Sequence, residues 1–207
     1  MRRLLGVLAI TALAGCATVN KMESGDQNIG ERMTLHLEGA WNHVALPNQG
    51  PAQTWTMEGL PVDVLLIYSG LKDGQAIHGP GAAGQKSFNF RANMQADEIV
   101  ALFEGFLTRD GSEFKLLKLE PSAFGGEKGF RFEYALTRKA DGVTLSGFGY
   151  STVSKGELFA LVYQAPRLTF FARHKDRVEQ IAVESHHATD SGANSRVTVR
   201  RSVRVHP

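Results

Sequence analysis

The stretch Phe130-Arg131-Phe132-Glu133-Tyr134-Ala135-Leu136-Thr137 decides the fold, because its bulky apolar residues recur at every second position. A period of two is the pattern of a β-strand with one buried face. Asp141-Gly142 then supplies hairpin turn chemistry, and residues 143–153 form the predicted return strand. Lys155-Gly156 turns the chain again into the apolar run 158–163. The sequence therefore predicts a three-stranded antiparallel meander.

Two glycines of the predicted return strand, Gly147 and Gly149, lie on one face of it. Glycine inside a strand either permits a bulge or leaves room for a bulky neighbour. Further strands are expected where short apolar or alternating runs are bounded by glycine, proline or polar turns. These runs are residues 33–37, 54–57, 62–68 and 113–120, the last ended by Pro121.

Two helices are predicted around this sheet. Residues 96–109 and 168–184 each carry apolar side chains at intervals of three and four, which gives one apolar stripe per helix. Asp97 and Glu98 lie in the first turn of the first helix, where the helix dipole favours anions. The expected fold class is α+β, with an antiparallel β-sheet covered by helices in a single globular domain spanning residues 31–185.

This order of elements resembles the PsbP-like family of helix-sheet-helix sandwiches. The resemblance is carried by residues 126–185, where a strand meander leads into a closing helix. It includes no catalytic motif, so it implies no catalytic residue. Members of that fold mostly resemble binding or assembly factors, and the body is also similar to bacterial envelope lipoproteins.

The amino-terminal region has the organisation of a secretory signal. Arg2 and Arg3 precede an apolar run that ends at Leu13-Ala14-Gly15-Cys16, and this run is shorter than the roughly 20 residues that a membrane span needs. The four residues resemble the lipobox of bacterial lipoproteins. The resemblance implies that residues 1–15 are a signal peptide and that Cys16 is the lipidation site, carrying acyl chains such as palmitate.

Lipidation at Cys16 would make the membrane a partner of the protein, because two or more acyl chains give a stable anchor. Residue 17 is alanine, whereas aspartate at this position resembles an inner-membrane retention signal. We therefore expect a cell-envelope location, with the outer membrane facing the periplasm favoured over the inner membrane. Residues 16–30 are mostly polar or small without a period, which predicts a lipidated cysteine followed by a flexible tether spanning on the order of 20 Å.

The last segment, residues 186–207, is predicted to be a flexible basic tail. Arginines and valines interleave between Arg196 and Val205. This segment could contact anionic lipid or an anionic envelope polymer, or could add a strand to the sheet edge of an envelope protein. A solvated tail without a partner is the alternative.

Charge and motifs exclude several function classes. Without Arg2 and Arg3, 21 basic residues face 21 acidic residues, so nucleic acid is not an expected partner. The string Gly79-Pro80-Gly81-Ala82-Ala83-Gly84 matches G-x-G-x-x-G, but it lacks the strand before it and the helix within it that a dinucleotide site requires. No cofactor is expected. His186 and His187 are adjacent but lack a third ligand, so no metal site is expected either.

No catalytic residue can be assigned, and His174 is the one weak candidate. It lies on or beside the apolar stripe of the second predicted helix, where a packed, hydrogen-bonded histidine is the alternative to proton chemistry. Two functions remain open. One is a non-enzymatic envelope lipoprotein that binds or helps assemble another component. The other is a small-ligand-binding protein or enzyme whose helix-sheet pocket uses His174.

Overall fold

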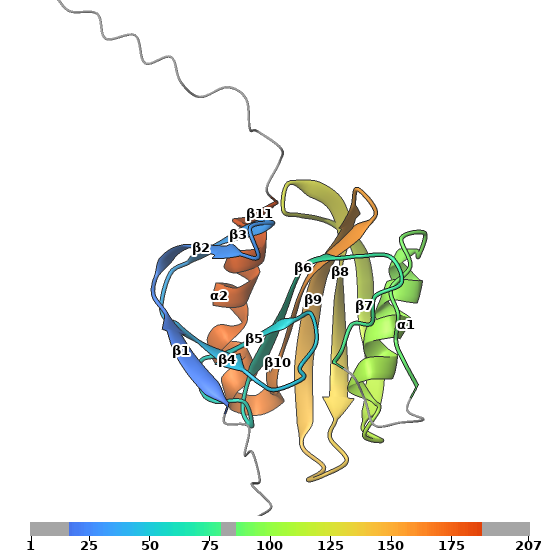
Figure 1. Cartoon of the computed structure of the whole chain (residues 1–207). Helices are drawn as coiled ribbons and strands as arrows, with labels where there is room; N and C mark the ends of the chain where they lie inside the picture. The colour runs from blue at the N-terminus through green and yellow to red at the C-terminus, as the bar shows by residue number, and fades with distance from the viewer. Residues whose placement is uncertain (1–16, 80–85, 188–207) are drawn as a thin grey trace, which may run out of the picture.

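A computed structural model of the chain describes residues 17–79 and 86–187. Its centre is an eight-stranded antiparallel sheet with the strand order β1-β4-β5-β6-β10-β9-β8-β7 (Figure 1). The strands are β1 (Thr18–Met22), β4 (Trp41–Ala45), β5 (Gln53–Thr56), β6 (Val64–Leu71), β7 (Glu113–Phe124), β8 (Glu127–Thr137), β9 (Thr144–Ser154) and β10 (Glu157–Pro166). A smaller sheet contains β11 (His186–His187), β3 (Met33–Leu37) and β2 (Gly25–Ile29), in that order.

Two helices cover opposite faces of the large sheet. α1 (Ala96–Leu107) packs on the face that carries the aromatic side chains of β8, and α2 (Ala172–Val183) packs on the other face together with β3. Each face has its own buried apolar cluster, so the sheet lies between two cores. The predicted α+β class and the helix-sheet-helix arrangement are therefore confirmed, and within the described residues no helix is long and apolar enough to cross a membrane.

The predicted meander is present as β8, β9 and β10, with register running from Phe130 opposite Ser151 to Thr137 opposite Thr144. Gly149 lies opposite Phe132 and Gly147 lies opposite Tyr134. A Cβ atom at Gly149 would come within 2.4 Å of the Phe132 ring, and one at Gly147 within 2.2 Å of the Tyr134 ring. The two glycines therefore leave the space that the aromatic rings of β8 occupy.

The predicted tether is wrong for residues 18–29. Residues 18–22 form β1, which pairs with β4, and residues 25–29 form β2, which pairs with β3. Most side chains of these two strands are not buried, so backbone hydrogen bonds rather than an apolar period define them. Ile29 is the exception and is buried in the core beneath α2.

Other boundaries also differ from the prediction. Pro121 lies within β7 rather than ending it, because β7 is an edge strand and a missing N–H on the unpaired side breaks no ladder bond. The second helix begins as a π-helical turn, η1 (Arg167–Phe171), before α2. β4 was not predicted, since its polar residues Asn42 and His43 interrupt the apolar pattern.

Two residues of the predicted tail, His186 and His187, form a strand instead. His186 and His187 pair with Thr34 and Met33 of β3, which makes them part of the small sheet. Residues 188–207, including the arginine-valine segment, lie outside the described residues, as do Cys16 and residues 80–85 of the glycine-rich string.

Candidate functional site

His174, the catalytic candidate from the sequence, is buried at the start of α2 and only 6% exposed. Its Nε2 atom lies 2.8 Å from Oε1 of Glu58, in the loop between β5 and β6. The guanidinium of Arg173 donates to the same oxygen at 3.0 Å. Hydrogen bonds from His174 and Arg173 lower the pKa of Glu58, so this carboxylate is charged in the folded protein.

The Glu58 loop is held by a second, fully buried acid, Asp63. Its carboxylate accepts hydrogen bonds from the Thr56 hydroxyl at 2.5 Å and from the backbone N–H groups of Met57 and Glu58 at 3.0 and 2.7 Å. These bonds fix the loop in the position from which Glu58 reaches α2. The hydrogen bonds of Asp63 and Glu58 therefore connect the β5–β6 loop to the start of α2.

An acid within hydrogen-bond distance of His174 is one of two features that proton chemistry there would need. The other is a cavity for a substrate. His174 does not line any of the three surface hollows described below. Its side chain is 6% exposed and hydrogen-bonded to Glu58, as in a packed, hydrogen-bonded histidine.

Arg131, which is 7% exposed, forms a network of ion pairs that the sequence did not reveal. Its guanidinium lies 2.5 Å from Glu133 of β8 and 2.5 Å from Glu179 of α2, and it packs over the rings of Phe148 and Tyr150. Although burial opposes the charged form, the hydrogen bonds that Arg131 donates to both glutamates raise its pKa. The network ties α2 to the sheet.

The adjacent histidines of β11 have different surroundings. His186 is exposed, whereas the ring of His187 stacks on Phe159 at 4.2 Å and meets Phe124 edge-on at 5.5 Å. Burial lowers the pKa of His187. In the described part of the chain, His, Cys, Asp and Glu side chains form no group of three that could hold a metal ion.

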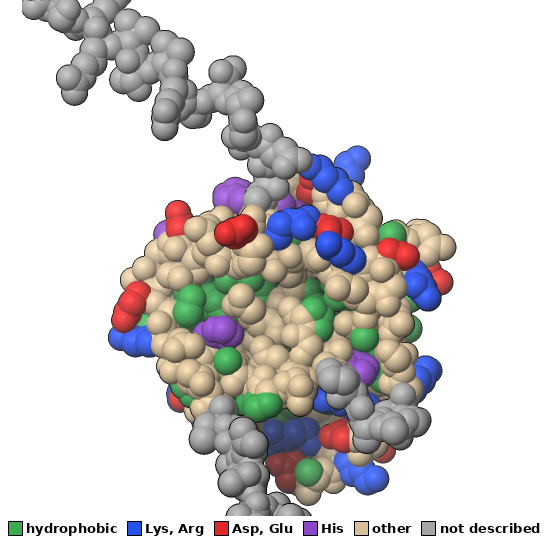
Figure 2. Space-filling model, in the orientation of Figure 1, with side chains coloured by type: hydrophobic (Ala, Val, Ile, Leu, Met, Phe, Trp, Pro, Cys, Tyr) green, Lys and Arg blue, Asp and Glu red, His purple; other side chains and the backbone are tan. Residues whose placement is uncertain are grey.

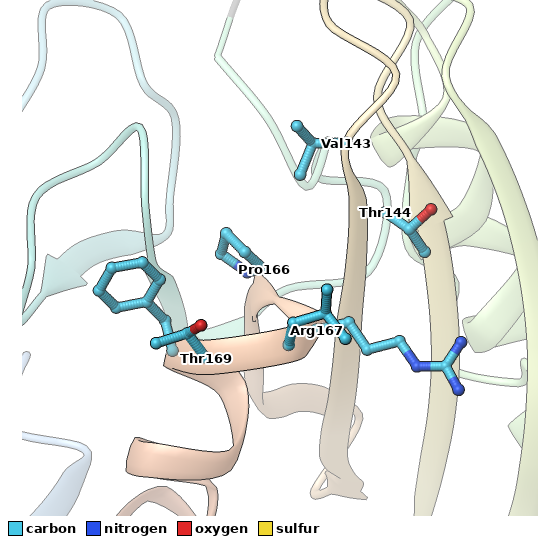
Figure 3. Close-up of a pocket in the computed structure, with 7 residues that line it drawn as sticks. Val143, Thr144, Pro166, Arg167 and Thr169 are labelled. Atoms are coloured by element: carbon cyan, nitrogen blue, oxygen red, sulfur yellow. The ribbon is translucent and has the colours of Figure 1, made fainter.

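A surface hollow of about 480 Å³ lies where β10 passes into α2 (Figure 3). Val143 and Thr144, at the start of β9, form one wall, and Pro166 and the residues of η1 form the other. Leu168 at this turn is 94% exposed. The hollow is open and mostly apolar, with Arg167 as its charged residue.

The outer edge formed by β7 carries three of the exposed large apolar side chains of the described chain. β8 is the only described strand that pairs with β7, so the other edge of β7 is open. Leu116, Leu117 and Leu119 of β7 are exposed, Leu117 by 55%, at a β-bulge between 116 and 118.

Two hollows continue this edge toward the β7–β8 turn. One, of about 380 Å³, lies between the start of α1 and the sheet, and includes Met94, Ile99, Leu119 and Phe130. The other, of about 440 Å³, shares Pro121, Lys128 and Gly129 with it. On the face shown in Figure 2, by contrast, charged side chains of both signs lie around the rim, and the middle carries hydrophobic and uncharged groups.

Comparison of the sequence with models of known families gives no match, and comparison with curated proteins also gives none. The fold is similar to that of cyanobacterial PsbP (CyanoP) from Synechocystis sp. PCC 6803, with a TM-score of 0.54 and 14% identity over 89% of this chain and 99% of that chain. LpqN, a protein involved in cell envelope biogenesis in Mycobacterium tuberculosis, gives a TM-score of 0.45 and 12% identity over 84% of this chain and 92% of that chain. At this identity, the CyanoP match shows a PsbP-like fold and no shared function.

Proposed function

We propose that this protein is a lipid-anchored component of the bacterial cell envelope that acts by binding another envelope component, without catalysis. Cys16 holds it in the membrane, and the outer membrane facing the periplasm is the favoured location because residue 17 is alanine. The partner is an envelope protein or an anionic envelope polymer.

The anchor is supported by the order of Arg2-Arg3, the apolar run and Leu13-Ala14-Gly15-Cys16. The tether after this anchor is shorter than the sequence predicts. Because β1 begins at Thr18, two peptide steps separate the anchor cysteine from the sheet, and they can span at most about 7 Å. The domain is therefore held at the membrane surface rather than on a long tether.

The observation that carries the binding role is the exposed leucine edge of β7. Monomeric proteins rarely leave a row of large apolar side chains on an open sheet edge, since such an edge can pair with another chain. Apolar side chains cover both faces of the sheet, so its faces are not available to a partner, whereas the β7 edge and its flanking hollows are.

The alternative function is a small-ligand-binding protein or enzyme that uses His174. One observation favours it, namely the Glu58 carboxylate 2.8 Å from the imidazole. A ligand would have to enter where Arg173 and the β5–β6 loop now close over His174. If this function is correct, Glu58→Gln should abolish a ligand-dependent activity without unfolding the protein.

In-cell cross-linking of tagged protein, followed by mass spectrometry, tests the binding role. Leu117→Lys should abolish the capture of a specific envelope partner. Val183→Lys, at an apolar site on α2 that is more exposed than Leu117, should leave capture unchanged. Equal capture by wild type and Leu117→Lys would rule out the β7 edge.

Cell fractionation tests the anchor independently. The Cys16→Ser variant should leave the membrane fraction, and the mass of the wild-type protein should show acylation and loss of residues 1–15. A Cys16→Ser protein that stays fully membrane-bound would contradict the anchor.

A further inference from the structure

The π-helical turn η1 exposes an apolar side chain that has no packing role in the described structure. Leu168 is 94% exposed, the highest value of any large hydrophobic residue in the described chain. Beside it lies the open hollow formed by Val143, Pro166 and Phe170 (Figure 3). Full burial of a leucine side chain contributes about 1.5 to 3 kcal/mol, so this turn gains from an apolar environment that the chain itself does not supply.

The position of η1 in the fold relates it to the anchor. Pro166 pairs with Leu145, which places η1 beside the turn between β8 and β9. In Figure 1, this turn, the start of α2 and the start of β1 all lie at the lower end of the molecule, whereas β11 and the β9–β10 turn lie at the upper end. A membrane that holds the acylated Cys16, two residues before Thr18, would therefore contact this lower end of the domain.

The charges at this end suit an anionic surface. Arg167 and Lys139 are exposed, and neither forms an ion pair with another described residue. The acids of the neighbouring turns include Asp110, Asp141, Glu58 and Asp63. Asp141 is paired with Arg138 at 2.8 Å, Glu58 is paired with Arg173 at 3.0 Å, and Asp63 is fully buried. Each basic residue near an anionic lipid surface contributes about 1 kcal/mol of attraction.

We propose that η1 is a membrane-seating element, with Leu168 inserted into the lipid leaflet that carries the acylated Cys16 and Arg167 at the headgroups. The proposal rests on the proposed lipid anchor. Val19, which is exposed and three residues after Cys16, would lie near the same surface. The anchor sets the distance of the domain from the membrane, and η1 sets its orientation, so the β7 edge is held in a fixed direction for its partner.

A tryptophan at position 168 reports insertion directly. The two natural tryptophans, Trp41 and Trp55, are buried and give a constant background. The chain from Cys16 onward, with either Leu168→Trp or Val183→Trp, is coupled through its only thiol to a maleimide lipid in vesicles of phosphatidylethanolamine and phosphatidylglycerol. Val183 is the matched control, because it is 74% exposed at the other end of α2.

We expect Leu168→Trp to shift its emission to shorter wavelength on the vesicles and to be quenched by brominated lipid at least twice as strongly as Val183→Trp. Equal quenching of the two variants, or an unshifted spectrum for Leu168→Trp, overturns the proposal. Because the lipid is attached chemically, the outcome does not depend on whether cells acylate Cys16. Fractionation of Cys16→Ser tests that step separately.

Discussion

Replacing Gly149 with alanine tests the packing that defines the meander. The added Cβ would lie 2.4 Å from two atoms of the Phe132 ring and 3.1 Å from the carbonyl oxygen of Leu161. The ring cannot retreat easily, because Phe132 is fully buried and stacks between Phe103 and Tyr134, with ring centroids 5.9 Å away on each side. The substitution therefore overfills the core on the α1 side of the sheet.

The expected cost results from two opposing effects. Overpacking of a buried core typically costs about 1 to 3 kcal/mol, whereas alanine in place of a strand glycine gains roughly 0.5 to 1 kcal/mol through reduced backbone entropy. The contacts of 2.4 Å involve a ring that cannot retreat, so the overpacking cost lies in the upper part of its range, and the net loss in the free energy of unfolding is about 1 to 2 kcal/mol. For a chain of this size, that loss lowers Tm by roughly 2 to 8 °C.

Urea unfolding, followed by tryptophan fluorescence, measures this loss as a lower midpoint at an unchanged m-value. Gly39→Ala is the control, since the nearest atom to its Cβ would be in the Arg177 side chain at 3.7 Å. The double variant Gly149→Ala with Phe132→Leu should be less destabilised than the sum of the two single variants. A Gly149→Ala protein as stable as wild type would refute the reasoning.

Three further predictions concern charged and titratable groups that hold α2 and β11 in place. Arg131→Met removes two charge-assisted hydrogen bonds, and because Glu133 and Glu179 can regain water, urea unfolding should show a loss of about 2 to 4 kcal/mol. Glu58→Gln should be less stable than wild type at neutral pH but equal to it in acid. The lowered pKa of Glu58 gives stability that is present above its ordinary pKa and is lost as the pH falls. Equal Tm values of the two proteins at pH 7 would contradict the stabilising role of the Glu58–His174 contact. Burial lowers the pKa of His187. The stability that the neutral ring contributes is therefore fully present above the ordinary histidine pKa of about 6.5 and is lost as the pH falls further. His186 opposes protonation of His187, whereas Glu127 favours it. His187→Phe should therefore reduce the fall in Tm between pH 7 and pH 5. A fall as large as that of wild type would contradict this role of His187.

The meander and both helices could be predicted because their signals are local. The alternation from Phe130 to Leu136 and the two glycines opposite it lie within 20 residues of sequence, from Phe130 to Gly149. By contrast, β1 depends on pairing with β4, where Thr18 meets Ala45, and its exposed side chains carry no apolar period. Such a strand can be recognised only when the position of its partner strand is known.

The charged contacts of the candidate sites could not be predicted, because they join residues far apart in the chain. Glu58 and His174 are separated by 116 residues, and Arg131 and Glu179 by 48. The alternation correctly placed Arg131 on the face opposite the aromatic residues of β8. It could not show that α2 folds over that face and buries the guanidinium. The alternation of residues along a strand shows on which face of the sheet a side chain lies. The tertiary fold determines which other element covers that face.

The start of β1 at Thr18 has a consequence for how partners are encountered. On the proposed anchor, the domain explores a layer on the order of 40 Å thick, about its own diameter, and diffuses in two dimensions. A partner embedded in the same leaflet is then present at a high effective concentration. Affinities too weak to detect between the isolated molecules in dilute solution would suffice there, so reconstitution on a shared bilayer is the setting in which this protein's associations should be measured.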